Sequence, residues 1–237
     1  MVKPPEGTVT IMFTDIAGST ALRDSFVAQK GEICGDEEYR RHVLNLHNKK
    51  IRPLLNRHNG FEVETNGDSF MAAFSRPADA VSCSAEIQNA FQSNPIPTDK
   101  GNLSVRIGIH TGQPMLFRSG AGWDYDGHAV TVASRIEALL KGGGQILCSE
   151  NTRAVAGHLP GIRYHSCGRY DLKGVTSAPQ VFEILWHDAQ TPAPPVQPRD
   201  GIPYPWLTEW VGRREKWRSL LGCFVAGSWS RSLDRVA

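Results

Sequence analysis

The chain has 237 residues, of which 40% are hydrophobic and 21% are charged, and its formal net charge is +2. This composition is typical of a globular protein that holds one large domain, with or without an appendage. A net charge so close to zero excludes any argument from charge alone for a nucleic-acid partner.

Neither the ends of the chain nor its cysteines indicate export or a membrane. The opening MVKPPEGTVT lacks the apolar core of a signal peptide, and the apolar run LLGCFVAG is too short to span a bilayer. The five cysteines are widely spaced and form no Cys-x-x-Cys pair, so reduced thiols are expected instead of disulfides or a zinc site. We therefore expect a soluble, cytoplasmic protein without a membrane partner.

The N-terminal part of the chain reads as a strand followed by two helices. Apolar and β-branched residues predict a strand over 8–13, and the helix that follows could be capped by Ser19 or Thr20. Apolar residues then return at helical spacing over 36–58, where Pro53 is expected to kink the helix or restart it.

The middle of the chain opens with its clearest turn signal. In FEVETNGDSFMAAF, residues 61–74, an Asn-Gly pair separates two apolar runs, which predicts a β-hairpin. A helix after Pro77, a strand over 103–111 and a helix over 128–141 follow. Short strands are expected last, at 145–149, 164–172 and 180–186. This mixture predicts an α+β fold, with helices covering one face of a mostly antiparallel sheet.

The composition changes after the last predicted strand. Six prolines fall within QTPAPPVQPRDGIPYP, which predicts an extended linker. The expected organisation is one domain over 1–187, a Pro-rich linker over 188–205 and a short C-terminal tail over 206–237.

Two acidic residues stand at the ends of predicted strands. Asp15 closes the first strand, and Asp68 directly follows the Asn-Gly pair of the hairpin. If the fold brings these ends together, the two carboxylates repel each other unless a cation lies between them. Paired oxygen ligands with room for water and phosphate suit Mg²⁺ or Mn²⁺. The alternative for each acid alone is local, a helix cap for Asp15 and turn hydrogen bonds for Asp68.

An arginine on a helix face adds a third feature. Within GWDYDGHAVTVASRIEAL, residues 122–139, Thr131 and Arg135 are four apart and share one face of the predicted helix. A guanidinium held there can donate two hydrogen bonds to phosphate oxygens. A solvated position is the commoner case for any one arginine, so only its combination with the acids argues for a phosphate site.

Three motifs, in order and with matching spacing, resemble the class III nucleotidyl cyclases, which include adenylate and guanylate cyclases. They are VTIMFTDIAGST, VETNGDSFMAAF and WDYDGHAVTVASRIEAL, with a weaker fourth, YDLKGVTSAPQVFEI. The resemblance runs from about residue 7 to residue 185. It implies a ferredoxin-like βαββαβ core with added elements, and a head-to-tail homodimer whose sites lie between the two chains.

The resemblance also implies a role for each matching residue. Asp15, Asp68 and the main-chain carbonyl of Ile16 would hold two Mg²⁺ or Mn²⁺ ions. These ions would activate the ribose 3′-hydroxyl of ATP or GTP and brace the triphosphate for attack at the α-phosphorus. Arg135, from the partner chain, would neutralise charge on the α-phosphate, and Lys173 would contact the terminal phosphates.

The two positions implied for base recognition disagree with each other. Glu64 is the residue type of guanylate cyclases, whereas Asp124 is the residue type of adenylate cyclases. Ionised Glu64 offers no donor for adenine N1, and ionised Asp124 faces guanine O6 acceptor to acceptor. A protonated Glu64, its pKa raised by burial near Asp124, would donate to adenine N1. We therefore expect a weak preference for ATP over GTP.

Thr131 also departs from the family pattern, which has asparagine there to orient the ribose. The shorter hydroxyl predicts slow catalysis, because loss of one such contact costs about 10- to 1000-fold in rate. Glu64 and Thr131 favour the alternative of a catalytically silent module that dimerises and senses a nucleotide. An RNA-binding ferredoxin-like module is disfavoured, because its paired exposed aromatics are missing. His110 is expected to be packed and not reactive.

The predicted tail carries one further resemblance. WVGRREK is similar to the opening of ATPase modules that often follow this domain in bacterial chains, but no Gly-rich phosphate loop follows it. The tail is therefore interpreted either as a remnant of such a module or as a loosely ordered end.

Overall fold

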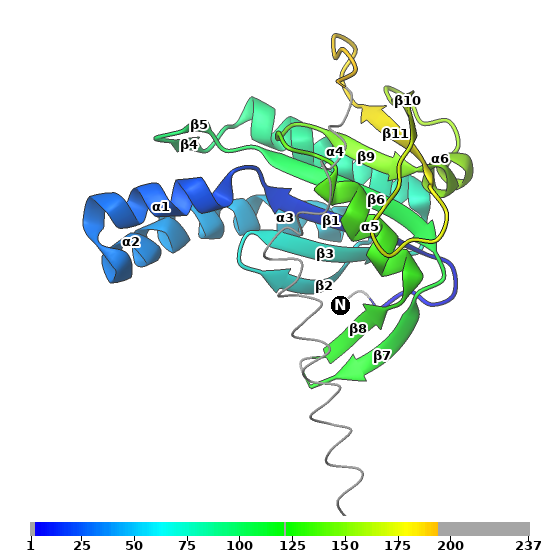
Figure 1. The fold of residues 1–237 in the computed structure, drawn as a ribbon, viewed down its shortest axis with the longest axis horizontal. Helices are drawn as coiled ribbons and strands as arrows, with labels where there is room; N and C mark the ends of the chain where they lie inside the picture. Colours follow the sequence, from blue (N-terminus) through cyan, green and yellow to red (C-terminus); the bar gives the residue numbers. More distant parts are fainter. Residues whose placement is uncertain (1–2, 121, 194–237) are drawn as a thin grey trace, which may run out of the picture. The chain divides into compact units, whose positions relative to one another are not determined.

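A seven-stranded sheet forms the centre of the part of the chain that the computed structural model describes, residues 3–120 and 122–193. Its strands are β1 (Val9–Ile16), β2 (Phe61–Asn66), β3 (Ser69–Phe74), β6 (Val105–Gly112), β9 (Ile146–Ser149), β10 (Arg163–Arg169) and β11 (Gln180–Leu185). They lie in the order β10-β11-β9-β6-β1-β3-β2 (Figure 1). Among these described strands the β6–β9 pair is parallel and the others are antiparallel, which confirms the predicted α+β fold class.

Helices cover both faces of this sheet, and not one face as expected. They are α1 (Ser19–Lys30), α2 (Glu32–Tyr39), the π-helical turn η1 (Arg40–Leu44), α3 (Asn45–Arg57), α4 (Pro77–Ser93), α5 (His128–Ala138) and α6 (Glu150–Ala156). The helix α5 packs on one face against β1 and β6, while α3, α4 and α6 pack on the other (Figure 1). Two strand pairs lie outside the sheet, β4 (Pro97–Thr98) with β5 (Gly101–Asn102) and β7 (Met115–Ser119) with β8 (Gly122–Asp126).

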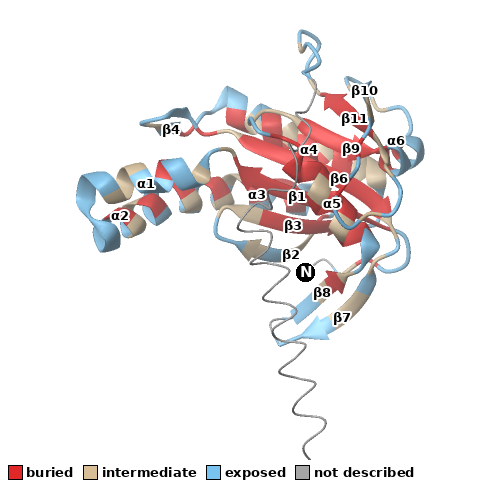
Figure 2. Ribbon diagram, viewed as in Figure 1, coloured by how far each residue is buried: buried red, intermediate tan, exposed pale blue. Residues whose placement is uncertain are grey.

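Alternation along the strands sends apolar side chains to both faces of the sheet, and core clusters form on each face among the described residues. Side chains on the face toward α3 and α4 form the larger cluster, which includes Met12, Phe70 and Ile107. The smaller cluster lies under α5 and includes Val132 and Leu147. The central strands are buried on both faces, whereas β7 and much of α1 and α2 are exposed (Figure 2).

The helix α5 approaches the sheet very closely at Gly108 on β6. A Cβ added to Gly108 would lie 2.3 Å from the backbone nitrogen of Glu137, so a larger residue does not fit unless the helix moves. The missing side chain at this position therefore sets the height of α5 above β1 and β6.

The predicted hairpin is confirmed, but its turn begins one residue later than expected. Gly67 and Asp68 form the turn between β2 and β3, and Gly67 has a positive φ of 62°. Asp68 therefore lies within the turn and not after it. The pairing of β2 with β3 also shifts by one residue between Glu62 and Glu64, which marks a β-bulge in β2.

The N-terminal helices correct three expectations. Capping of α1 by Ser19 or Thr20 is wrong, because Gly18 is the N-cap and makes no side-chain hydrogen bond. The helix α3 does not restart at Pro53 but contains it, and the helical register changes earlier, at η1, where a π-helical turn accommodates an extra residue. Helical structure also resumes before residue 36, since α2 begins at Glu32.

Sequence spacing also missed four short elements of the described chain, β4, β5, β8 and α6, because each is too short to show a period of its own. The predicted linker over 188–205 extends past the described residues, and the predicted tail over 206–237 lies wholly outside them. Within the described ranges, no helix combines the length and apolar character needed to cross a membrane.

Candidate active site

Asp15 and Asp68, the two acids predicted to share a cation, lie close together. Asp15 is near the end of β1 with 5% of its surface exposed, and Asp68 is half-buried in the neighbouring turn. Burial raises the pKa of Asp15 to about 7, with a further contribution from the negative charge of Asp68, and Arg106 opposes this rise. The expected convergence of the two strand ends is therefore present.

Arg106 is a buried partner of Asp15 that the sequence analysis missed. Its Nε and Nη2 donate to Oδ2 of Asp15 at 3.1 and 2.5 Å, and its Nη1 donates to the Leu140 carbonyl at 2.9 Å. Both of these hydrogen bonds to Asp15 end on Oδ2. A charged residue inside the otherwise apolar strand VRIGI was the signal that could have identified it.

Glu137 on α5 completes a buried ionic cluster with Asp15 and Arg106. Its Oε1 lies 2.5 Å from Nε of Arg106, and its side chain is 1% exposed. The same Nε also donates to Asp15, so the two carboxyls share one side of the guanidinium. Burial raises the pKa of Glu137 to about 8, while the charge of Arg106 opposes the rise.

This cluster has fewer positive than negative charges, which fits a cation. Asp15 and Glu137 both contact the guanidinium of Arg106, and Asp68 lies near Asp15. Burial is the main cause of the raised pKa values of Asp15 and Glu137, and the negative charge of Asp68 adds to both. Carboxylate oxygens are the ligands that Mg²⁺ and Mn²⁺ prefer. In the described part of the chain, no three or more His, Cys, Asp or Glu side chains gather as a metal site. An ion beside the two aspartates would therefore complete its coordination with the Ile16 carbonyl, water and substrate oxygens.

Cation binding at Asp15 should depend on pH. We expect Mn²⁺ to raise the unfolding midpoint more at pH 8 than at pH 6, because the ion must displace a proton from a carboxyl whose pKa is about 7. Below that pH the affinity is expected to fall about tenfold per unit. Without metal the sign is opposite, since a carboxyl whose pKa rises on folding stabilises the fold at low pH, and this contribution is lost as pH rises from about 4 to about 7.

Thermal denaturation of two variants checks this pH dependence. In Asp15→Asn, which cannot take up the proton, the extra stabilisation by Mn²⁺ at pH 8 is expected to vanish. In Asp24→Asn, which changes an exposed acid on α1, it is expected to persist. Equal stabilisation of the wild-type protein by Mn²⁺ at both pH values would contradict the prediction.

The two residues predicted to contact phosphates lie side by side. Nε of Arg135, on α5, donates to the main-chain carbonyl of Lys173 at 3.1 Å. Burial lowers the pKa of Arg135, but a guanidinium keeps its charge at neutral pH. Lys173 is exposed, so its ammonium is available to a ligand. As predicted, Arg135 and Thr131 lie on the half-buried side of α5, opposite the buried side chains of Val132 and Ile136.

The hydroxyl of Thr131 is engaged within its own helix. It donates to the carbonyl of Gly127, four residues earlier, at 3.3 Å. Such a bond competes with any hydrogen bond that the hydroxyl would donate to a ligand. This geometry agrees with the expectation that threonine is a weaker ribose contact than asparagine.

The two residues implied in base recognition come from strands that contact each other. Glu64 lies in β2, and Asp124 lies in β8, where its Oδ1 accepts from the backbone N–H of Tyr125 at 2.7 Å. The buried ring of Tyr125 anchors β8, because its hydroxyl donates to the Pro5 carbonyl at 2.6 Å. Glu64 is exposed, so this chain alone does not supply the burial on which its expected protonation depends.

The site residues thus form two groups on one chain. The first is Asp15, Asp68 and the Ile16 carbonyl. The second is Glu64, Asp124, Thr131, Arg135 and Lys173. Among the described residues, no hydrogen bond or ion pair joins the two aspartates to Thr131, Arg135 or Lys173.

His110 is packed as expected. It is 7% exposed, and its Nδ1 lies 2.8 Å from the Ser149 hydroxyl. Burial lowers the pKa of His110 to about 4, with a smaller contribution from His128, so the imidazole is neutral at physiological pH.

Known proteins similar to this chain are nucleotide cyclases and an uncharacterized relative. Residues 1–185 match the family model of the adenylate and guanylate cyclase catalytic domain. An uncharacterized protein of Mycobacterium tuberculosis is 29% identical over 218 residues, which cover 89% of this chain and 69% of that protein. An adenylate cyclase of Neurospora crassa is 34% identical over 170 residues, which cover 63% of this chain and 7% of that much longer enzyme.

Solved structures agree with this match. A structure of adenylate cyclases from Trypanosoma brucei in their monomeric state has a TM-score of 0.65 at 27% identity, covering 83% of this chain and 97% of that chain. A guanylyl cyclase structure has a TM-score of 0.58 at 26% identity, covering 76% of this chain and 93% of that chain. A guanylate cyclase domain of Catenaria anguillulae in complex with GTP shares the fold, with a TM-score of 0.61 at 19% identity over 76% and 96% of the two chains. The chain therefore belongs to the family of adenylate and guanylate cyclase catalytic domains, which are enzymes of the lyase class.

Proposed function

We propose that this chain converts a nucleoside triphosphate, with ATP favoured over GTP, to a 3′,5′-cyclic nucleotide and pyrophosphate. The observation that carries the proposal is the closeness of the buried Asp15 to the half-buried Asp68, two carboxyls that suit a divalent cation. The adjacent Arg135 and Lys173 supply positive charge for a triphosphate. The adenylate cyclase among the similar proteins supports the same reaction.

Each residue of the site has a defined task in this reaction. Asp15, Asp68 and the Ile16 carbonyl would hold two Mg²⁺ or Mn²⁺ ions, which when bound lower the pKa of the ribose 3′-hydroxyl and neutralise the triphosphate. Arg135 donates to the oxygens of the α-phosphate while the 3′-oxygen bonds to the α-phosphorus and the bond to pyrophosphate breaks. Lys173 holds the terminal phosphates and stabilises the departing pyrophosphate.

The two groups of site residues favour a homodimer in which the chains pair head to tail. Each chain carries the aspartates in one group and Arg135 with Lys173 in the other, and no hydrogen bond or ion pair among the described residues joins the aspartates to Arg135 or Lys173. In a two-fold pair, the aspartates of one copy face the second group of the other copy, and two equivalent sites result.

The base preference of these sites depends on Glu64 and Asp124. The Asp124 carboxylate accepts from the exocyclic amine of adenine, and Glu64 donates to adenine N1 only when protonated. The exposed Glu64 would acquire the necessary burial from the partner chain and the bound nucleotide. A mismatched polar pair costs about 1 to 3 kcal/mol when desolvated, so the preference for ATP is expected to be modest.

Product analysis with purified protein tests the proposal. With Mn²⁺ and either ATP or GTP, the wild-type chain is expected to form cyclic AMP faster than cyclic GMP. Asp15→Ala is expected to form neither product, whereas Asp24→Ala, at an exposed position, is expected to retain activity. Equal turnover of GTP and ATP would overturn the base preference. Absence of both products would favour the silent nucleotide-sensing module, which the engaged Thr131 hydroxyl supports.

We also propose that the cyclase domain spans 1–187, followed by a linker over 188–205 and an accessory tail over 206–237. A cytoplasmic location is proposed with it. The absence of disulfides among the four described cysteines, Cys34, Cys83, Cys148 and Cys167, supports that location, because thiols stay reduced in the cytoplasm.

A further inference from the structure

The β-bulge in β2 decides which way Glu64 points. In an antiparallel pair, residues opposite each other lie on the same face of the sheet. Glu62 lies opposite Ala72, whereas Glu64 lies opposite Met71, the next residue along β3. Glu62 and Glu64 therefore lie on opposite faces, although residues two apart on a regular strand share a face.

The face that receives Glu64 is the one on which α5 packs, and α5 carries Thr131 and Arg135, which belong to the same group of site residues as Glu64. Met71 lies opposite Phe13 of β1, and Asp15, two residues after Phe13, shares that face. Arg106 lies opposite Asp15 on the same face. Without the bulge Glu64 would lie opposite Phe70 and point toward α3, away from Asp15.

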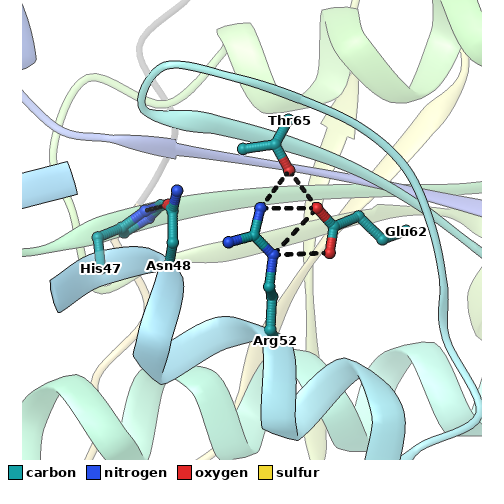
Figure 3. Close-up of polar contacts among 5 residues, drawn as sticks. All are labelled: His47, Asn48, Arg52, Glu62 and Thr65. Atoms are coloured by element: carbon teal, nitrogen blue, oxygen red, sulfur yellow. Dashed lines mark hydrogen bonds and ion pairs between the residues drawn. The ribbon is translucent and has the colours of Figure 1, made fainter. Parts of the chain in front are cut away.

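Arg52 of α3 holds β2 on both sides of the bulge. Its Nε donates to Oε2 and Oε1 of Glu62 at 3.0 and 3.2 Å, and its Nη2 donates to Oε1 of Glu62 at 2.9 Å. Nη2 also reaches the Thr65 hydroxyl at 3.5 Å, and that hydroxyl donates to Oε1 of Glu62 at 2.6 Å. Figure 3 shows the guanidinium beside the Glu62 carboxylate and below Thr65, with its stem rising from α3. One arginine thus contacts the residues before and after the extra residue.

These contacts exist only in the bulged register. Glu62 and Thr65 are three residues apart, so a regular strand would place them on opposite faces. With the bulge, Thr65 lies opposite Phe70 and shares the α3 face with Glu62. The guanidinium of Arg52 also stacks over the Phe70 ring, 5.4 Å from its centroid, which fixes the height of the arginine above the sheet.

The pair of Arg52 and Glu62 is ionised. Partial burial tends to raise the pKa of Glu62, but hydrogen bonds from Arg52 and Thr65 outweigh it and lower the pKa. A guanidinium that donates to both oxygens of one carboxylate adds directional constraint to charge attraction. The side chains of Arg52 and Glu62 are 47% and 33% exposed, so solvent screens their charge attraction. The pair therefore acts mainly by fixing the position of β2 relative to α3.

We infer that Arg52 is a positioning residue for base recognition, which clamps the β2 bulge through Glu62 and Thr65 and so directs Glu64 into the nucleotide site. The inference rests on the proposed function, because it assigns Glu64 to the base. It predicts that Arg52 affects discrimination between ATP and GTP although it contacts neither nucleotide.

Arg52→Met tests the clamp, because methionine keeps an apolar stem over Phe70 and removes every donor. The ratio of kcat/KM for ATP to that for GTP is expected to move about tenfold toward the ratio of Glu64→Ala, because a small displacement of a contact group is enough. The matched control is Arg57→Met. Arg57 lies on the same helix in an exposed ion pair with Glu86, away from β2, and its loss is expected to leave the ratio unchanged.

A double variant separates positioning from general loss of structure. In the Glu64→Ala background, Arg52→Met is expected to cause no further change in the ATP to GTP ratio, since both substitutions remove the same contact. The clamp is refuted if Arg52→Met alone changes the ratio by less than about twofold, or if it changes the ratio equally with and without Glu64, because independent effects add.

Failure of the proposed function gives a different result. If the wild-type chain forms no cyclic product, the dissociation constants of ATP and GTP are measured with Mn²⁺ instead of kcat/KM. They are measured for the wild type, Arg52→Met, Arg57→Met, Glu64→Ala and the double variant. The clamp is still supported if Arg52→Met reduces the difference in affinity between ATP and GTP when Glu64 is present and does not change it when Glu64 is replaced. If the wild-type chain binds the two nucleotides equally or binds neither, Glu64 does not distinguish adenine from guanine and the clamp is overturned.

Discussion

An equal mixture of Asp15→Ala and Arg135→Ala chains is expected to recover about a quarter of the wild-type cyclase rate, because random pairing makes half of the dimers mixed and each mixed dimer keeps one of its two sites. Each variant alone is expected to lose about 100-fold or more, through loss of the cation for Asp15 and of α-phosphate stabilisation for Arg135. The mixture would therefore be far more active than either component.

The expectation follows from where the two residues lie. Asp15 belongs to the buried cluster at the end of β1, whereas Arg135 lies beside Lys173 on the outer side of α5. If one chain supplied both residues to the same site, a damaged chain could not be repaired by another damaged chain. Recovery thus reports a site that is shared between copies.

The matched control combines Asp15→Ala with Asp68→Ala. Both changes remove ligands of the same group, so every dimer in that mixture has a damaged cation site and no recovery is expected. Cyclic nucleotide formation is measured after subunit exchange, which is verified by co-purification of chains that carry different tags. Exchanged chains of Asp15→Ala and Arg135→Ala without recovered activity would contradict the head-to-tail arrangement.

The outline of the fold and the identity of the two acids could be predicted from local signals. The Asn-Gly pair of the hairpin and the apolar spacing of α4 and α5 depend on neighbouring residues, and both predictions are confirmed. Asp15 and Asp68 could be paired because each stands at a strand end. Their actual closeness is set by the antiparallel pairing of β1 with β3, which joins segments more than fifty residues apart.

Other features depend on contacts that sequence spacing does not contain. Arg106 was missed because its partners, Asp15 and Glu137, come from a different strand and from α5. The bulge in β2 was missed because VET reads as regular alternation, and it becomes visible only through the pairing with β3. The predicted cap of α1 was wrong. The N-cap is Gly18, in a left-handed conformation, so Ser19 and Thr20 already lie within the first turn of the helix.

Arg106→Met is expected to lower the free energy of unfolding by about 3 to 5 kcal/mol at pH 8, because it leaves buried carboxylates without their counter-charge. Arg106 is 9% exposed and its partners Asp15 and Glu137 are 7% and 1% exposed, so water cannot replace the guanidinium. The change also removes the hydrogen bond to the Leu140 carbonyl, just after α5 ends. Urea denaturation of the purified chain measures the loss, and Arg23→Met, in an exposed pair with Asp36, is expected to lose less than about 1 kcal/mol.

The dependence of this loss on pH distinguishes a charge effect from a packing effect. Asp15 and Glu137 have raised pKa values even with Arg106 present, and its removal raises them further, so in the variant both carboxyls are more fully protonated at pH 6 than at pH 8. A neutral carboxyl does not need the guanidinium. The destabilisation by Arg106→Met is therefore expected to be smaller at pH 6 than at pH 8. It should also shrink at pH 8 in the double variant with Glu137→Gln, which removes one of the two negative charges. An equal loss in the free energy of unfolding at both pH values would mean that Arg106 stabilises the fold by packing. It would also argue against excess negative charge beside Asp15 as the reason that a cation binds there.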